Sequence, residues 1–190
     1  MVASVQKYGG FYMGRYEASK NTTTNKAQSI PNQMPWVNIP WASAGMSNFS
    51  AGGAVEKARN VYPITSSTKV GDVVSTLPYG VQWDATVRFI LTKYPEDIIT
   101  DSKDYGNYGT SNLISTGSKS AYELNNIYDM AGNVLEWTME REASSGGWTT
   151  VYRGGNIYTS GNMNSISSRG KNTYYNTYSA GGFRIALYIK

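Results

Sequence analysis

Three oxygen-bearing side chains, Asp129, Asn133 and Glu136, lie close together in the segment YDMAGNVLEW. Carboxylate and amide oxygens are hard ligands, and calcium takes about six to eight of them, so carbonyls of a tight turn would complete such a site. The alternative role for Glu136 is to be the buried partner of an arginine. These residues are the metal-site candidates of the chain, and calcium is the only cofactor we consider.

The chain contains neither Cys nor His. It therefore cannot build a thiolate nucleophile, a Ser-His-Asp triad, a structural zinc site or a three-histidine iron site, and it cannot form disulfides. A pair of carboxylates, as in a glycosidase, remains available in principle. None of the 13 acidic residues, however, forms a recognisable catalytic pair in a motif.

The segment 143–181 consists mainly of Tyr, Asn, Ser, Thr and Gly. Tyr offers a large contact area at low entropic cost, and Ser, Gly and Asn offer adaptable hydrogen bonds, which is the mixture that antibody loops use. A plain surface loop is the alternative, because Ser, Asn and Gly also favour turns. We favour a ligand-binding surface. Its candidate contact residues are Asn156, Tyr158, Asn162, Asn164, Asn172, Tyr174, Tyr175, Asn176 and Tyr178.

Tryptophans and arginines occur at positions that suggest different roles. Trp148 lies in the Gly-rich turn SSGGWTT, where core neighbours are hard to supply, so it joins the candidate ligand contacts. The other tryptophans are expected to be core or loop anchors, because large aromatic side chains dominate burial; they are Trp36, Trp41, Trp83 and Trp137. Three arginines are expected to bind loop carbonyls or a carboxylate such as Glu136; they are Arg153, Arg169 and Arg184.

The length of 190 residues suits a single domain spanning 1–190. No apolar run approaches the roughly 18 residues that a membrane span needs, and the start lacks the apolar core of a secretory signal. The net charge is +4, but Lys and Arg are scattered singly. A nucleic-acid site usually shows a clustered basic stripe, so we do not expect a nucleic-acid partner.

The spacing of hydrophobic residues and the positions of Gly and Pro predict a few helices and strands that would position these residues. The segment 83–91 has apolar residues on one helical face, and the helix should end before Pro95. A second helix is expected after Pro40, and 97–122 should be a long ordered loop. A turn at Gly132 and Asn133 should lead into a strand. The predicted strands are 9–19, 135–141, 151–158 and 181–190, the last with a buried face at Phe183, Ile185, Leu187 and Ile189.

Several sequence blocks, in this order and spacing, resemble the formylglycine-generating-enzyme (sulfatase-modifying factor) family of C-type-lectin-like domains. They are GFYMGRYEAS, LPYGVQWDA, NIYDMAGNVLEW, VYRGG and GGFRIALYIK, of which GNVLEW, RGG and GFR are the specific part. The resemblance implies an α+β C-type-lectin-like fold with long loops and little regular secondary structure.

That family includes oxidases that use a cysteine pair, iron enzymes that use three histidines, and binding proteins without catalysis. Because this chain lacks both residue types, it resembles the binding branch, especially the variable proteins of diversity-generating retroelements and related phage tail or surface proteins. The resemblance implies a variable ligand-binding region at 143–181, a protein or glycan receptor on a target cell, a location on a virion tail or cell surface, and self-association. The alternatives are a structural domain of a tail or adhesin protein, or an enzyme of this superfamily that uses no Cys or His.

Overall fold

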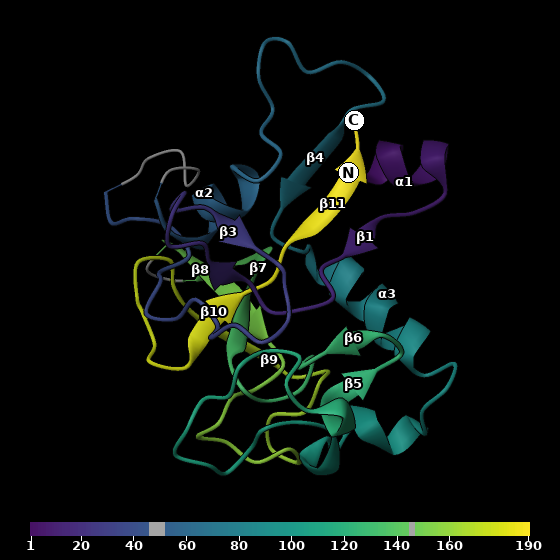
Figure 1. The fold of residues 1–190 in the computed structure, drawn as a ribbon, viewed down its shortest axis with the longest axis vertical. Helices are drawn as coiled ribbons and strands as arrows, with labels where there is room; N and C mark the ends of the chain where they lie inside the picture. Colours follow the sequence, from purple (N-terminus) through teal and green to yellow (C-terminus); the bar gives the residue numbers. More distant parts are fainter. Residues whose placement is uncertain (46–51, 145–146) are drawn as a thin grey trace.

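We describe the protein from a computed structural model, which describes residues 1–45, 52–144 and 147–190. A three-stranded and a four-stranded sheet, two two-stranded hairpins, three α-helices, short 3-10 helices and long loops make up this part of the chain (Figure 1). One sheet has the strand order β1–β11–β4, and all its pairs are antiparallel. It lies near both chain ends, with helix α1 beside it. The bounds are β1 Tyr12–Met13, β4 Val73–Thr76, β11 Ala186–Ile189 and α1 Val2–Tyr8.

The second sheet has the order β10–β7–β8–β9 and carries most of the C-terminal segment. β7 and β8 form a long antiparallel hairpin, β9 pairs with β8, and β10 runs parallel to β7. The bounds are β7 Leu135–Ser144, β8 Gly147–Arg153, β9 Arg169–Thr173 and β10 Gly181–Phe183. Two-residue hairpins add β2 Ser19–Lys20 with β3 Ala27–Gln28, and β5 Glu123–Leu124 with β6 Ile127–Tyr128.

The predicted amphipathic helix is confirmed as α3, Gly80–Ile90, with Trp83, Val87 and Ile90 buried. The helix expected after Pro40 begins only at Gly53 and ends at Arg59, as α2. The stretch 46–51 of that prediction lies outside the described residues. The loop predicted at 97–122 contains three short 3-10 helices, η1 Glu96–Ile99, η2 Lys103–Tyr105 and η3 Ser120–Tyr122, and isolated bridges at Asn107 and Thr116.

Three strand predictions need correction. Within the strand predicted at 9–19, only Tyr12–Met13 and Ser19, the first residue of β2, lie in strands, and helix α1 precedes this segment. The strand predicted at 151–158 ends at Arg153, because the next two residues, Gly154 and Gly155, have positive φ and turn the chain. The C-terminal strand is divided into β10 and β11, which belong to different sheets.

The division of the C-terminal strand follows from its buried side chains. Phe183 and Ile185 are buried as predicted, and Leu187 and Ile189 are half-buried. Arg184 between them is also fully buried and holds a carboxylate and backbone carbonyls. Since side chains on both sides of the chain are enclosed here, this segment connects the two sheets through the centre of the fold.

Tryptophans anchor the core as expected. Trp41, Trp83 and Trp137 are buried, and each indole N–H donates to a backbone carbonyl: of Thr138 at 2.6 Å, Ile166 at 2.8 Å and Ile39 at 3.0 Å, respectively. Buried indoles usually need such partners. These hydrogen bonds connect segments far apart in sequence, so the loops are held by the core.

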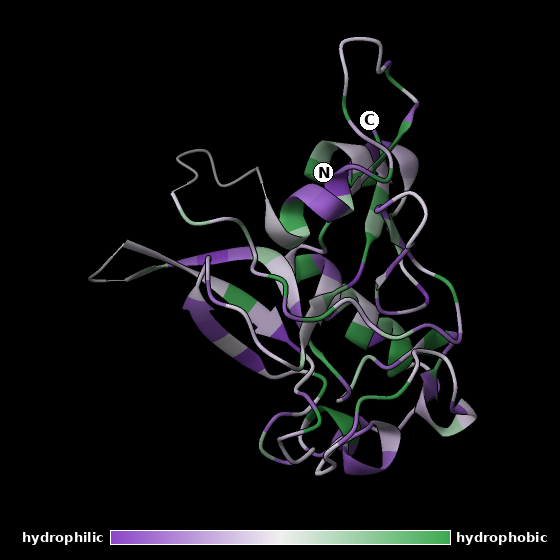
Figure 2. Ribbon diagram, turned by 60° about the vertical axis from the view of Figure 1, so that its left-hand side comes forward, coloured by the Kyte–Doolittle hydropathy of each residue, from purple (hydrophilic) through white to green (hydrophobic). Residues whose placement is uncertain are grey.

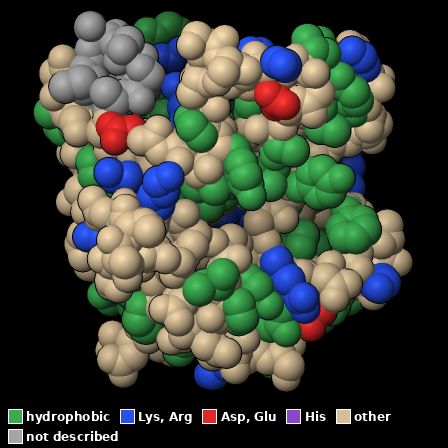
Figure 3. All heavy atoms as spheres, turned by 45° about the horizontal axis from the view of Figure 1, so that its top comes forward, with side chains coloured by type: hydrophobic (Ala, Val, Ile, Leu, Met, Phe, Trp, Pro, Cys, Tyr) green, Lys and Arg blue, Asp and Glu red, His purple; other side chains and the backbone are tan. Residues whose placement is uncertain are grey.

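The surface shows how this scaffold presents its loops. In Figure 2 the ends of β7 and β8 that flank residues 145–146 extend away from the body of the molecule. On the face seen in Figure 3, Lys and Arg side chains are dispersed among polar and hydrophobic ones. Among the described residues, no helix has the length and apolar character needed to cross a membrane.

Candidate ligand-binding surface

A buried ion pair fixes the framework beneath the C-terminal loops. Arg184 donates from Nε to Glu136 Oε2 at 2.7 Å and from Nη2 to Glu136 Oε1 at 2.6 Å. Its remaining donors reach the carbonyls of Gly14 at 2.9 Å, Tyr128 at 3.0 Å and Asp129 at 3.2 Å. The predicted role of Arg184 as a partner of Glu136 and of loop carbonyls is confirmed.

The other two predicted arginines also pair with carboxylates. Arg153 is buried, and its Nη2 lies 2.5 Å from Oδ1 of Asp84 on α3 and its Nη1 lies 3.8 Å from Glu140 Oε2. Arg169, at the start of β9, forms an ion pair with Glu140. These contacts join α3, β7, β8 and β9, so the arginines beside the glycines support the sheet that carries the candidate surface.

Two of the calcium candidates, Asp129 and Asn133, occupy a turn and have positive φ, and the third, Glu136, follows on β7. Asn133 Oδ1 accepts from Asn107 and Ile114, both at 3.1 Å, and its Nδ2 donates to Glu17 Oε2 at 2.6 Å. Asp129 Oδ2 accepts from the Thr116 hydroxyl and the Gly117 amide, both at 2.9 Å, whereas Oδ1 has no hydrogen-bond partner in the described part of the chain.

No group of three or more acidic side chains placed to hold a metal occurs among the described residues. Calcium binding at Asp129, Asn133 and Glu136 stays a prediction. For Glu136 to bind the ion, its ion pair with Arg184 would have to break, because Arg184 binds both of its carboxylate oxygens.

Sequence reasoning missed Glu17, which completes this buried cluster. It is fully buried, and besides the contact to Asn133 it accepts from the Val134 amide at 3.2 Å. Burial raises the pKa of Glu17 well above its ordinary value, and the nearby Asp129 and Glu136 raise it further, while Arg184 opposes them. Burial also raises the pKa values of Asp129 and Glu136. The acidic residue in GRYEAS was visible in the sequence, but no spacing signal linked it to a turn so distant in the chain.

The predicted contact residues divide into two neighbourhoods. One group surrounds the end of β9 and the turn after it. There the Tyr174 and Tyr175 rings pack edge to face at 5.1 Å, and Asn176 Nδ2 donates to Asn172 Oδ1 at 2.8 Å. Asn172 also donates to the Tyr178 hydroxyl. Both sets of contacts fall within residues 172–178, at the end of β9 and in the turn after it, and so form a local cluster.

Trp148 and Tyr158 extend this cluster from two other segments. Thr149 pairs with Thr173 across β8 and β9, so the next residues, Trp148 and Tyr174, lie at the same end of the sheet. The Ser179 hydroxyl donates to the Tyr158 hydroxyl at 3.4 Å, which brings the loop after Gly155 to the turn before β10. We call this set the Tyr-Asn surface. It comprises Trp148, Tyr158, Asn172, Tyr174, Tyr175, Asn176 and Tyr178.

The members of the Tyr-Asn surface differ in exposure. Trp148, Tyr158 and Tyr175 are 52%, 62% and 50% exposed. Tyr178 is half-buried, and its ring packs against Trp137 at 6.0 Å and Tyr152 at 5.8 Å. The exposed rings are available to a ligand, whereas Tyr178 also supports the surface from below.

The remaining predicted residues lie in the loop 155–168, where they shape the backbone. Asn156 Oδ1 accepts from the Tyr158 amide at 2.9 Å, and Asn162 Oδ1 accepts from the Ser160 hydroxyl at 2.7 Å. The Asn164 carbonyl accepts from Tyr108 Oη at 3.0 Å. Asn162 and Asn164 thus belong to a loop region that packs beside η1 and η2, and the described contacts do not join them to the cluster of tyrosines.

The fold places the chain in the class of C-type-lectin-like domains, with mixed helix and sheet and long ordered loops. The chain belongs to the sulfatase-modifying factor enzyme 1-like domain family, which matches residues 5–189. The resemblance drawn from the sequence blocks is therefore confirmed. A comparison with curated proteins finds no match.

Major Tropism Determinant and CarF show a similar fold at low sequence identity. The I1 variant of Major Tropism Determinant is 16% identical with a TM-score of 0.56, covering 96% of this chain and 52% of its own. CarF is 18% identical with a TM-score of 0.51, covering 100% of this chain and 81% of its own. Treponema denticola variable protein 1 is 22% identical with a TM-score of 0.48, covering 62% of this chain and 49% of its own. The chain thus spans about half the length of two of these proteins.

Proposed function

We propose that the chain is a non-catalytic binding domain whose Tyr-Asn surface contacts a protein or glycan receptor. The observation that carries the proposal is that three segments, the start of β8, the loop after Gly155 and the turn after β9, each expose an aromatic ring on a framework fixed by buried ion pairs. Rigid aromatic rings beside adaptable amides and hydroxyls are typical of antibody paratopes. An ordered framework lowers the entropic cost of presenting them.

The sequence supports the non-catalytic part of the proposal. The chain has no Cys or His, so neither the cysteine-pair oxidation nor the histidine-iron chemistry of its family can be carried by its side chains. The buried carboxylates hold structural partners, since Glu136 binds Arg184 and Glu17 binds the turn at Asn133. Binding is the function that these residues can perform.

We further propose that this binding domain is displayed outside the cell. We infer a variable protein of a diversity-generating retroelement, carried on a phage tail or a bacterial surface, with the diversified positions within 143–181. The fold likeness to Major Tropism Determinant supports this setting, and the Asn, Tyr, Ser and Thr content of the segment fits it. Lys and Arg are scattered singly along the sequence, which supports a receptor other than nucleic acid. We also infer a homo-oligomer, which analytical ultracentrifugation would test.

The binding proposal can be tested with two pairs of tyrosines of similar exposure. Fluorescently labelled protein is applied to a glycan array and to intact bacteria of several species, and saturable binding is measured. The double variant Tyr158→Ala/Tyr175→Ala should lose at least about tenfold in affinity, because exposed aromatic anchors carry much of the binding energy. The control variant Tyr12→Ala/Tyr62→Ala removes exposed rings elsewhere on the molecule and should bind normally. Equal loss in both variants, or no saturable binding at all, would argue against the proposal.

A further inference from the structure

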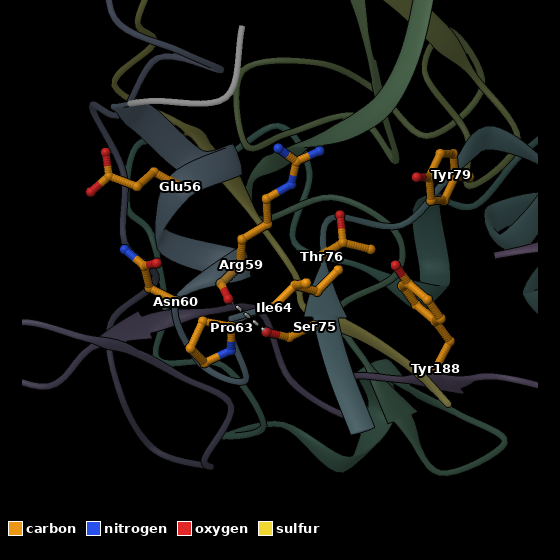
Figure 4. Close-up of a pocket in the computed structure, with 9 residues that line it drawn as sticks. All are labelled: Glu56, Arg59, Asn60, Pro63, Ile64, Ser75, Thr76, Tyr79 and Tyr188. Atoms are coloured by element: carbon orange, nitrogen blue, oxygen red, sulfur yellow. Dashed lines mark hydrogen bonds between the residues drawn. The ribbon is translucent and has the colours of Figure 1, made fainter. Parts of the chain in front are cut away.

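A cavity of about 460 Å³ lies between α2 and the sheet β1–β11–β4, away from the Tyr-Asn surface. Its wall combines the end of α2, the loop at Pro63 and Ile64, strand β4 and the residues Tyr79 and Tyr188 (Figure 4). The Ser75 hydroxyl donates to the Arg59 carbonyl at 3.3 Å and so fastens β4 to the end of α2. A cavity of this size is within the range of small-ligand sites.

The cavity holds one guanidinium that the protein leaves without a carboxylate. Among the described residues Arg59 forms no ion pair. The acid at the rim, Glu56, is oriented elsewhere: its Oε2 accepts from the Gly52 amide at 2.5 Å, and its Oε1 lies 3.7 Å from Lys57 Nζ. Figure 4 shows the Glu56 carboxylate directed away from the Arg59 guanidinium. An unpaired guanidinium is suited to a carboxylate of a ligand, which it can hold with two parallel hydrogen bonds.

Hydroxyl groups surround this guanidinium. The Thr76 side chain is 3% exposed, and its Oγ1 has no hydrogen-bond partner in the described part of the chain. Leaving a buried hydroxyl without a partner costs free energy, so the group is poised to gain from a ligand. In Figure 4 the hydroxyls of Thr76, Tyr79 and Tyr188 and the Arg59 guanidinium are directed toward the same central space.

The Tyr188 phenol remains a hydrogen-bond donor. Burial raises the pKa of Tyr188 above its ordinary value, the neighbouring Tyr79 phenol raises it further, and the Arg59 charge opposes the shift. Tyr188 lies on β11 opposite Val74, two positions from Thr76 on the same face of the pair. The register of the two strands therefore sets Tyr188 and Thr76 as neighbours.

We propose that this cavity binds an acidic sugar, with Arg59 on the carboxylate and Thr76, Tyr79 and Tyr188 on the ring hydroxyls. Pro63 and Ile64 supply the apolar wall against which the C–H face of a sugar ring packs. The three protein hydroxyls can both donate and accept hydrogen bonds, as sugar hydroxyls require. An inorganic anion such as sulfate only accepts, so it would leave their acceptor oxygens without a partner. The site goes beyond the receptor contact proposed for the Tyr-Asn surface and does not depend on it.

The experiment is a calorimetric titration of the intact chain with D-glucuronate, D-galacturonate and N-acetylneuraminate, with D-glucose and inorganic sulfate as comparison ligands. At least one acidic sugar should bind saturably, and Arg59→Gln should weaken it by at least about tenfold. The control variant Arg88→Gln, which changes an exposed arginine on α3, should leave the affinity for the acidic sugar unchanged. The methyl glycoside of the acidic sugar that binds is then compared with the free sugar. Equal binding would indicate that the natural ligand is the end of a glycan chain, and loss of binding would indicate that it is the free sugar.

Thr76→Val separates binding from folding. Because Thr76 Oγ1 has no partner in the free protein, the variant should melt at the same temperature as the parent or higher, yet bind the acidic sugar more weakly. The proposal is overturned if none of the three acidic sugars binds, if Arg59→Gln binds them unchanged, if glucose binds equally, or if sulfate competes as well as the sugars do.

Discussion

Replacing Arg184 by Met removes the charge at the centre of the framework while keeping a long apolar side chain in its place. Arg184 and Glu136 are both buried and share two short hydrogen bonds, and three backbone carbonyls lose a donor with them. Removing one partner of a buried pair typically costs roughly 3–5 kcal/mol, because the other charge is left in the interior. We expect Arg184→Met to lower the free energy of unfolding by that amount at neutral pH.

The cost should depend on pH in a defined direction. The pKa values of Glu136, Glu17 and Asp129 are raised in the folded protein, chiefly by burial, and the Arg184 charge lowers each of them. A carboxyl with a raised folded pKa stabilises the fold below its unfolded pKa, and this contribution is lost as pH rises through the folded pKa. Without Arg184 the three pKa values rise further. The destabilisation should therefore be smaller near about pH 5 than near about pH 7.5.

Urea unfolding monitored by tryptophan fluorescence at both pH values measures this effect. The control is Arg88→Met, an exposed arginine on α3, which should change the unfolding free energy by less than about 0.5 kcal/mol. A penalty below about 1 kcal/mol for Arg184→Met at neutral pH, or one that is the same at both pH values, would refute the assignment of Arg184 as the charge that neutralises this cluster.

Three further predictions follow from the geometry of the candidate surface. Tyr178→Ala should lower the unfolding free energy by about 2 kcal/mol, because its ring packs on the core, whereas Tyr158→Ala should cost less than about 0.5 kcal/mol; equal costs in urea unfolding would contradict this. Gly155→Ala should cost at least about 1 kcal/mol in the same assay, because φ is +71° and a Cβ would lie 2.3 Å from the Asn164 carbonyl oxygen; an unchanged midpoint would contradict it. If Asp129, Asn133 and Glu136 hold calcium as predicted, calcium should raise the melting temperature relative to a chelator, because a ligand of the folded state stabilises it; an unchanged melting temperature would contradict the calcium site and would mean that Glu136 keeps Arg184 as its partner.

The spacing of hydrophobic residues and the positions of Gly and Pro predicted those helices and strands whose pattern is set by neighbouring residues in the sequence. The helix at 80–90 follows from apolar residues on one face, and the hairpin strand after Gly132 follows from alternation. The division of the C-terminal strand could not be predicted, because alternation at Phe183 and Ile185 gives no sign that Arg184 is buried as well. Helix α1 has little sequence signal beyond the Gly9 that ends it in a left-handed conformation.

The candidate surface was predictable in composition but not in arrangement. The Tyr and Asn residues after β9 lie in one local cluster. Asn162 and Asn164 lie in another loop, where the Ser102 amide donates to the Gly161 carbonyl and the Tyr108 hydroxyl donates to the Asn164 carbonyl. The carboxylates that bind Arg153 and Arg169 come from α3 and β7. Such pairings depend on tertiary contacts between distant segments, which a single sequence does not display.

The DNA around the gene tests whether the Tyr-Asn surface is a diversified binding site. We predict a near-copy of the segment that encodes residues 143–184, differing from it almost only at adenines, beside a gene for a reverse transcriptase. The differing codons should include those of Tyr158 and Tyr175 on the Tyr-Asn surface and spare those of Arg153 and Arg184 in the framework. A copy whose differences fall on the framework residues, or the absence of any copy, would contradict the proposal that this surface is a diversified binding site.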